Sequence, residues 1–199
     1  EAVSFACLAL GTGGNIFVKG ARQGHLITFL NIVRRMGGEY EVKDDGIRFW
    51  RNGALKAISV ETGTHPGLMT DWQQPLAVLI TQANGVSDIH ETIYEDRFGY
   101  VKDLSAMGAD ISVFTDCGKS TQCRFVGGNF NHRATINGPI ELHGAELQVR
   151  DIRAGIAHVI AGLIANGESI LDGVEELDRG YEKIDTRLKN LGADITRCD

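Results

Sequence analysis

Arginines at expected turns and aspartates at expected helix starts are the side chains of this sequence best suited to act on an anionic ligand. Arg97 lies in "YEDRFGY", Arg179 in "ELDRGYE" and Arg153 in "RDIR". A guanidinium group binds a phosphate or a carboxylate through two parallel hydrogen bonds, which a lysine cannot do. Asp71, in "THPGLMTD", and Asp151, in "RDIR", could accept a proton or position a cation. The combination indicates chemistry on an anion.

Each of these residues also has a purely structural interpretation. Threonine and aspartate are preferred at helix N-caps, so Asp71 and Asp151 could simply cap the helices that follow them. The arginines could pair with acids beside them. The local pairs would be Glu95 or Asp96 with Arg97, and Asp178 with Arg179. Both interpretations stay open at this point.

Three similar segments indicate the elements that position these side chains. "RRMGGEYEV", "SAMGADISV" and "NLGADITRC" each follow a run whose apolar residues are three or four apart, which predicts an amphipathic helix. Gly37, Gly108 and Gly192 suit left-handed helix ends, and the alternation after them predicts strands. A more apolar helix is expected upstream of each, in "EAVSFACLAL", "DWQQPLAVLITQANG" and "DIRAGIAHVIAGLIANG". Arg97 and Arg179 then lie at equivalent corners.

The sequence therefore predicts an α+β fold of mixed α/β repeats: three βαβαββ units around a shared core. We expect one domain, 1–199, with repeats at about 1–60, 61–139 and 140–199. Residues 116–133 lengthen the second unit and are expected to form a surface hairpin or loop. The first unit opens inside its helix and lacks the strand that "ALKAISVETG" and "ATINGPIELHGAEL" supply to the others. We therefore expect a fragment, with the missing strand and a partner domain elsewhere in the full protein.

Composition and charge exclude several classes of protein. The chain has 199 residues, 43% hydrophobic and 23% charged, as is typical of a globular protein. Its formal charge of −6 argues against nucleic acid as a partner, because sequence-independent binding needs a basic surface. The longest apolar runs are far shorter than the roughly 20 residues that cross a bilayer. We expect no membrane partner and a cytoplasmic location.

No metal and no cofactor are expected. The six histidines show no metalloprotease spacing, the four cysteines lack paired C-x-x-C motifs, and no glycine-rich nucleotide motif occurs. Free thiols are the favoured interpretation of the cysteines. Cys117 and Cys123 lie six residues apart in a polar, glycine-rich segment. A local disulfide is therefore an alternative, and so is a metal clip formed by these cysteines with His132.

Several segments together resemble the enolpyruvyl transferase family. They are "HPGLMTDWQQPLAVL", "ETIYEDRF", "MGADI", "RDIRAG", "AGLIANGES" and "LDRGYEKIDTRLKNLGADI". The resemblance spans most of the chain apart from residues 116–133. "ETIYEDRF" is similar to the branch that uses UDP-N-acetylglucosamine rather than the branch that makes 5-enolpyruvylshikimate 3-phosphate. The resemblance implies an enzyme of two domains with the active site in the cleft between them. This chain would be one of the two domains.

The resemblance also implies a reaction and the residues that perform it. The enolpyruvyl group of phosphoenolpyruvate passes to the 3-hydroxyl of UDP-N-acetylglucosamine, with release of phosphate, at the start of peptidoglycan synthesis. Asp71 is implied as a base or positioning group beside that hydroxyl, Asp151 as an acid that orients the cluster, and Arg179 as a catalytic group near the reacting end of phosphoenolpyruvate. The substrate-binding positions implied are Ile93, Tyr94, Arg97 and Arg153.

The chain departs from the family in ways that keep alternatives open. The catalytic lysine, the mobile loop with the reactive cysteine and a further arginine have no counterpart here. We expect this chain alone to be inactive, because closure of a cleft between two domains completes such sites. The alternatives are a paralogue that acts on another acceptor, and a non-catalytic scaffold that binds a nucleotide sugar or a protein. Fold does not decide among them, since three-repeat domains also occur in RNA-processing cyclases.

Overall fold

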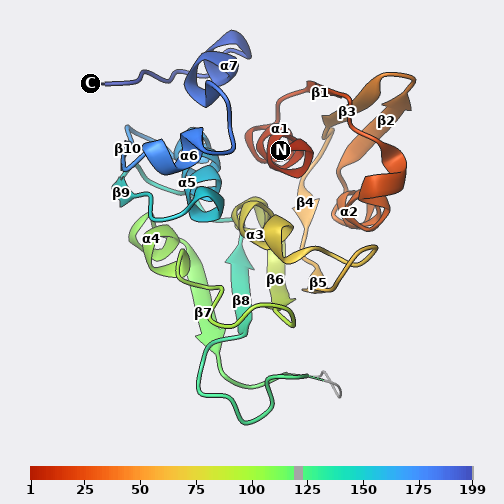
Figure 1. The fold of residues 1–199 in the computed structure, drawn as a ribbon, viewed down its shortest axis with the longest axis vertical. Coiled ribbons are helices and arrows are strands. Elements are labelled where there is room, and N and C mark those ends of the chain that lie inside the picture. The colour runs from red at the N-terminus through yellow and green to blue at the C-terminus, as the bar shows by residue number, and fades with distance from the viewer. Residues whose placement is uncertain (119–122, 199) are drawn as a thin grey trace.

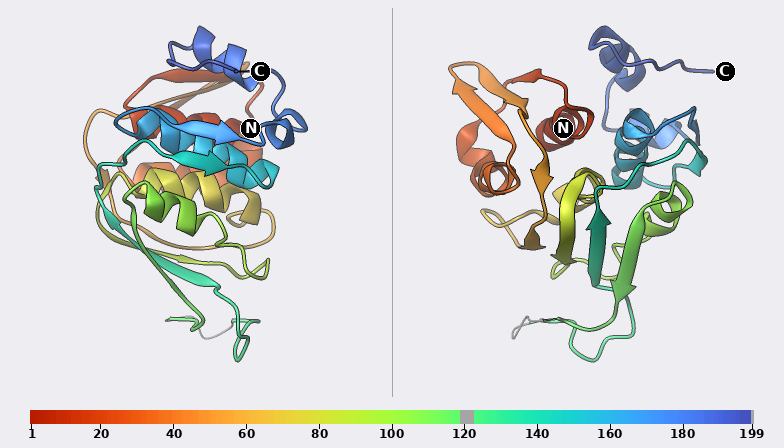
Figure 2. Two further views of the ribbon diagram at one scale, coloured as in Figure 1. Left: turned by 90° about the vertical axis from the view of Figure 1, so that its left-hand side faces the viewer. Right: turned by 180° about the vertical axis from the view of Figure 1, so that it is seen from behind.

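Three helices form the centre of the computed structural model, which describes residues 1–118 and 123–198 (Figure 1). They are α1 (Ala2–Thr12), α3 (Gln73–Ile80) and α5 (Ile152–Ile164), the apolar helices that the sequence predicts. Each contacts the other two, and they lie side by side in both views of Figure 2. Every residue of α3 is buried, so that helix has no solvent-facing stripe. Among the described residues, no helix is long and apolar enough to span a bilayer.

The predicted amphipathic helices form a second set outside the centre. They are α2 (Gln23–Arg35), α4 (Val101–Ala106) and α7 (Ile184–Asn190). Gly37, Gly108 and Gly192 follow them with φ of 86°, 98° and 95°, so the predicted left-handed ends are confirmed. Two shorter helices precede members of either set: η1 (Thr70–Trp72), a 3-10 turn before α3, and α6 (Glu175–Asp178) before α7.

The strands pair in three sheets within the described residues. The first has the order β1 (Ile16–Lys19), β3 (Gly46–Trp50), β2 (Glu39–Lys43). The second has the order β4 (Leu55–Lys56), β6 (Ala83–His90), β8 (Arg133–Gly138), β7 (Asp110–Phe114), with β5 (Ser59–Glu61) also beside β6. The third joins β9 (Glu146–Gln148) and β10 (Ile170–Asp172) in parallel.

One edge of the second sheet gathers the ends of three strands. β8 is antiparallel to both β6 and β7, and Arg133 at its start pairs with His90 on one side and Phe114 on the other. The predicted insertion 116–133 leaves the sheet at this edge, at the bottom of Figure 1. It forms turns without a strand in its described part before β8 begins, and residues 119–122 lie outside the described residues. The loop interpretation of the insertion is confirmed in that part.

The strand predicted in "DITR", residues 194–197, is wrong. That segment has no strand in the structure. β2 and β7, the corresponding segments, each pair with the strand that follows them in the chain, β3 and β8. Among the described residues no strand follows 194–197, and an alternating segment without a hydrogen-bonded neighbour does not form a sheet.

Gly144 marks a close approach of two backbone segments. Its N–H donates to the carbonyl oxygen of Asn166 at 2.8 Å, and a Cβ there would collide with the carbonyl oxygen of Glu168. We expect Gly144→Ala to lower the free energy of unfolding by about 1–3 kcal/mol, because backbone cannot rotate away as a side chain can. Urea unfolding measures the change. Gly53→Ala, whose Cβ would meet no atom within 4 Å, is the control, and equal losses in both variants would contradict the prediction.

Candidate active site

The turn before α4 and the η1 helix bring Arg97 and Asp71 into contact. Arg97 Nη2 donates to Asp71 Oδ1 at 3.0 Å, and Arg97 Nε donates to Thr70 Oγ1 at 3.1 Å. The Arg97 side chain is 5% exposed, whereas that of Asp71 is 55% exposed. The guanidinium is therefore fixed in place by two acceptors, while the carboxylate keeps an open side for another partner.

The first turn of α5 adds a second arginine and aspartate to this pair. Asp151 caps the helix, and its Oδ1 accepts from the N–H groups of Arg153 at 2.9 Å and Ala154 at 3.2 Å. Arg153 Nη1 donates to Asp71 Oδ1 at 3.4 Å, and Arg153 Nε lies 3.6 Å from Asp151 Oδ1. Asp71 is thus shared by Arg97 and Arg153, which come from distant parts of the chain.

The structure separates the two interpretations of the aspartates. Asp151 does cap α5, so its structural role is confirmed. Asp71 makes no capping hydrogen bond to η1 or α3. Its side chain faces the two arginines instead, so its contacts are ion pairs and not a helix cap.

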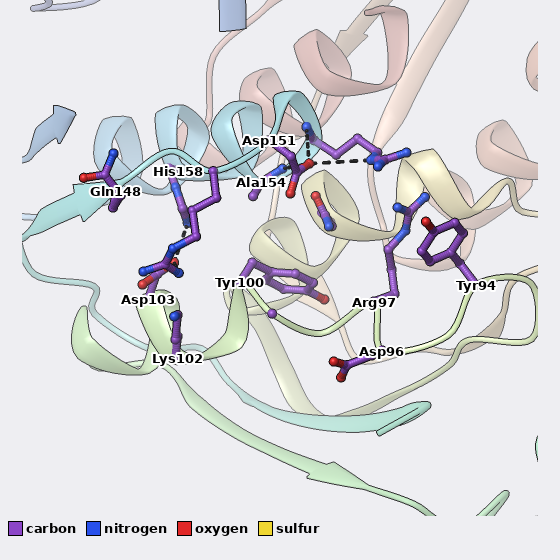
Figure 3. A pocket seen from close by; sticks show the side chains of 14 residues that line it. Tyr94, Asp96, Arg97, Tyr100, Lys102, Asp103, Gln148, Asp151, Ala154 and His158 are labelled. Carbon is purple, nitrogen blue, oxygen red and sulfur yellow. Dashed lines mark hydrogen bonds and ion pairs between the residues drawn. The ribbon is translucent and has the colours of Figure 1, made fainter. Parts of the chain in front are cut away.

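A cavity of about 340 Å³ opens beside this cluster. Figure 3 shows Tyr94 and Arg97 at one end of it and His158 near Asp103 at the other. The guanidinium carbon of Arg97 lies 4.5 Å from the centroid of the Tyr94 ring, a cation–π contact. The charged lining residues are Arg97, Lys102, Arg150 and Arg153 against Asp96, Asp103 and Asp151. Four basic and three acidic residues therefore line the cavity, and its arginines are groups that can bind an anion.

Glu91 supports the loop that carries two of the predicted residues. It is fully buried, and its Oε1 accepts from the N–H groups of Ile93 at 2.8 Å and Tyr94 at 3.0 Å. Oε1 also accepts from Thr62 Oγ1 at 2.9 Å, and Oε2 from Thr70 Oγ1 at 2.9 Å. The backbone of the predicted binding loop is therefore anchored to a buried carboxylate. Sequence reasoning missed Glu91, although it opens the quoted segment "ETIYEDRF".

Burial and neighbouring charges shape the electrostatics around Arg97. Its own burial and the charge of Arg153 lower the pKa of the Arg97 guanidinium, whereas Asp71, Glu91 and Asp151 raise it. The group stays charged, since an arginine in a protein does not lose its proton near neutral pH. The carboxylates therefore hold a permanent cation beside the cavity.

Besides the ring nitrogens of His158, two uncharged polar groups of the lining have no hydrogen-bond partner among the described residues. They are the hydroxyl of Tyr100 and Oε1 of Gln74. Burial, and next Glu91, raise the pKa of the Tyr100 phenol, so it stays protonated. A buried polar group without a partner is costly, and a ligand in the cavity could satisfy both. Neither residue was predicted, although Gln74 lies in "HPGLMTDWQQPLAVL" and Tyr100 in "YEDRFGY".

His158 and Asp103 form the opposite end of the cavity. His158 Nε2 lies 3.2 Å from Asp103 Oδ2, and the His158 side chain is fully buried. Burial lowers the pKa of His158, and Asp103 offsets part of that effect. We therefore expect a neutral imidazole at pH 7. This pair also escaped prediction, since the histidine lies within an apolar helix without a metal or catalytic motif.

The structure does not bring Arg179 to this cluster. Arg179 follows α6, its Nη1 donates to Glu176 at 2.7 Å, and its side chain is 73% exposed. Asp178, the local partner considered for it, accepts from Arg197 Nη1 at 3.1 Å instead. The four other charged residues of the prediction, Asp71, Arg97, Asp151 and Arg153, do come together.

The chain is similar to known proteins along nearly its whole length. A family model described as EPSP synthase (3-phosphoshikimate 1-carboxyvinyltransferase) matches residues 1–188. The chain belongs to the EPSP synthase family. Among relatives, the UDP-N-acetylglucosamine 1-carboxyvinyltransferase of Protochlamydia amoebophila is 45% identical over 98% of this chain and 42% of its own length. The protein of the same name from Chlamydia trachomatis serovar D is 45% identical over 100% of this chain and 45% of its own length.

Solved structures of this family agree with the fold. The enolpyruvyl transferase NikO from Streptomyces tendae has a TM-score of 0.80 at 25% identity, over 98% of this chain and 42% of that one. EPSP synthase from Acinetobacter baumannii has a TM-score of 0.58 at 19% identity over 86% of this chain and 38% of that one, a likeness of fold alone. The predicted mixed α/β fold and the resemblance to enolpyruvyl transferases are confirmed. The chain spans less than half the length of the relatives it matches.

Proposed function

We propose that this chain is part of an enzyme that transfers the enolpyruvyl group of phosphoenolpyruvate to the 3-hydroxyl of UDP-N-acetylglucosamine and releases phosphate. The observation that carries the proposal is the exposed carboxylate of Asp71 shared by Arg97 and Arg153 beside a cavity that both of these arginines line. The acceptor is proposed from the names of the relatives at 45% identity. On that basis the enzyme acts in the cytoplasm, in peptidoglycan synthesis.

The proposed roles follow from the contacts of each residue. Asp71 accepts the proton of the attacking hydroxyl or positions that hydroxyl, because one side of its carboxylate is open. Arg97 and Arg153 bind anionic groups of the substrates and offset charge that develops during addition and elimination. Asp151 orients Arg153. The loop at Ile93 and Tyr94 holds the nucleotide sugar, supported by Glu91.

Two further parts of the proposal concern groups outside this cluster. Arg179 is proposed to bind phosphoenolpyruvate near its reacting end, which requires its guanidinium to leave Glu176. A second domain of the same enzyme is proposed to complete the site, in line with the share of the relatives that this chain covers. Closing of two domains over substrate is a common way to exclude water and assemble the remaining groups.

Phosphate release by the whole protein tests the function. The protein is supplied with phosphoenolpyruvate and either UDP-N-acetylglucosamine or shikimate 3-phosphate, and we expect release only with the nucleotide sugar. Arg179→Ala should lower kcat/KM by about 10²–10³-fold, as loss of a group that stabilises developing charge does. Its free energy of unfolding should change by less than about 1 kcal/mol, because the pair with Glu176 is exposed.

Arg187→Ala is the matched control for Arg179→Ala. Arg187 also forms an ion pair on the surface, with Glu1 at 2.8 Å, and is 42% exposed. Equal loss of activity in both variants would contradict the role of Arg179. Release with shikimate 3-phosphate, or with neither acceptor, would point to a paralogue with another substrate or to a scaffold without chemistry.

A further inference from the structure

Four side chains at the edge where β6, β8 and β7 meet have the composition of a metal site. They are His90, Cys117, Cys123 and His132, and one ligand atom of each lies within 4.8 Å of those of the other three. His90 Nε2 lies 3.3 Å from Cys123 Sγ, and His132 Nε2 lies 3.4 Å from Cys117 Sγ. The cluster is separate from the cavity, since none of the four residues lines it.

Strand pairing explains how residues so far apart in sequence converge. β6 ends at His90, β7 ends shortly before Cys117, and β8 begins immediately after His132. The N–H of His132 donates to the carbonyl oxygen of Phe114 at 3.0 Å, which fixes the start of β8 against the end of β7. Cys123 comes from the loop between them. The sheet thus presents three of the side chains at one edge, and the loop supplies the fourth.

The separations fit a tetrahedral zinc ion. Zn–S bonds of about 2.3 Å and Zn–N bonds of about 2.0–2.1 Å in a tetrahedron place sulfur and nitrogen about 3.5 Å apart. Two of the four sulfur–nitrogen distances in the cluster, 3.3 Å and 3.4 Å, lie within a few tenths of an ångström of that value, and all four ligand atoms lie within 4.8 Å of one another. Small shifts of the side chains would then complete the coordination.

The outer hydrogen bonds of the histidines direct their lone pairs inward. His90 Nδ1 lies 2.8 Å from Glu61 Oε2, and His132 Nδ1 lies 3.1 Å from the carbonyl oxygen of Phe130. Both oxygens only accept, so in a neutral imidazole the proton is on Nδ1 and the lone pair is on Nε2. Carboxylate and carbonyl partners of this kind orient histidine ligands in metal sites. The N–H of Phe125 also donates to Cys123 Sγ at 3.4 Å, which stabilises a thiolate.

We propose that His90, Cys117, Cys123 and His132 bind one Zn²⁺ ion. Two sulfurs and two nitrogens make a closed tetrahedral set without an open position, which is characteristic of structural rather than catalytic zinc. His90, Cys123 and His132 are buried, so the ion would be shielded from water. It would fasten Cys117 and Cys123 to His90 at the end of β6. The proposal is independent of the reaction proposed above.

Zinc content and cobalt spectra of the whole protein test the site. The protein is purified from zinc-supplemented cells without chelator, and zinc is measured by inductively coupled plasma mass spectrometry. Wild type should hold about one zinc ion per chain more than the Cys117→Ser/Cys123→Ser variant. Apo wild type titrated with Co²⁺ should develop the visible absorption of tetrahedral cobalt and a thiolate-to-cobalt charge-transfer band. The cobalt titration needs no variant, so it stays decisive if the double variant fails to fold.

Cys7→Ala/Cys198→Ser is the matched control, since these two cysteines lie outside the cluster and the variant should keep its zinc. Zinc content equal in wild type and the Cys117→Ser/Cys123→Ser variant would overturn the proposal. So would a Cys117–Cys123 disulfide found by mass spectrometry after alkylation without reductant, or octahedral cobalt without a charge-transfer band.

Discussion

Asp71→Asn should reduce kcat for the proposed transfer by about 10²–10⁴-fold, the usual contribution of a positioned acid–base group. The substitution keeps the shape of the side chain, and the amide oxygen still accepts from Arg97. The protein should remain folded, because Asp71 is 55% exposed. What the variant loses is the negative charge and the ability to take a proton. We expect KM for UDP-N-acetylglucosamine to change much less than kcat.

Steady-state phosphate release by the whole protein, with each substrate varied in turn, measures this effect. Asp110→Asn makes the same chemical change at an exposed position of β7 outside the cavity, and it should retain wild-type kcat. An Asp71→Asn variant with kcat within about threefold of wild type would remove Asp71 from the acid–base role.

Glu91→Ala should lower the free energy of unfolding by about 3–5 kcal/mol. This is the usual cost of removing one charged partner from a buried ionic network. Four donors lose their acceptor together: the hydroxyls of Thr62 and Thr70 and the N–H groups of Ile93 and Tyr94. Arg97, which is 5% exposed, also loses a nearby negative charge. Buried groups left without partners dominate such losses.

Urea unfolding of the variant measures the loss, and two further variants locate its cause. Glu91→Gln keeps an oxygen for the Ile93 and Tyr94 N–H groups, so it should cost clearly less than Glu91→Ala. Glu95→Ala removes an acid from the same loop, but Glu95 is 64% exposed, and its effect should stay below about 0.5 kcal/mol. If Glu91→Ala unfolded at the same urea concentration as Glu95→Ala, the buried network would have no importance for stability.

Most elements of the fold could be predicted because their signals are local. The apolar stripes and the glycines after them give the helices α2, α4 and α7, and fully apolar runs give α1, α3 and α5. The failure at residues 194–197 has a physical cause: alternation describes a strand's two faces, but a strand also needs a partner.

The candidate site was predictable only in part, since its residues meet through tertiary structure. Asp71, Arg97, Asp151 and Arg153 were predicted, but the sharing of Asp71 by two arginines depends on how η1 and α5 pack. Glu91 opens the quoted segment "ETIYEDRF", but its importance follows from four donors that converge on it in the tertiary structure. Of the zinc cluster, Cys117, Cys123 and His132 were named as an alternative, but His90 was not, because it lies at the end of β6, far from Cys117 in the sequence.

His90 and Glu91 are consecutive residues with different surroundings. His90 contacts Cys123 and Glu61, whereas Glu91 contacts Thr62 and the N–H groups of the binding loop. Successive side chains of an extended segment point to opposite faces, so a slip of one residue between β6 and β8 would turn each of them to the wrong face. A slip in one direction would place the Glu91 carboxylate among the thiols, and a slip in the other direction would place the His90 imidazole among the donors. The alignment of β6 with β8 is therefore specified from both faces of the sheet at once.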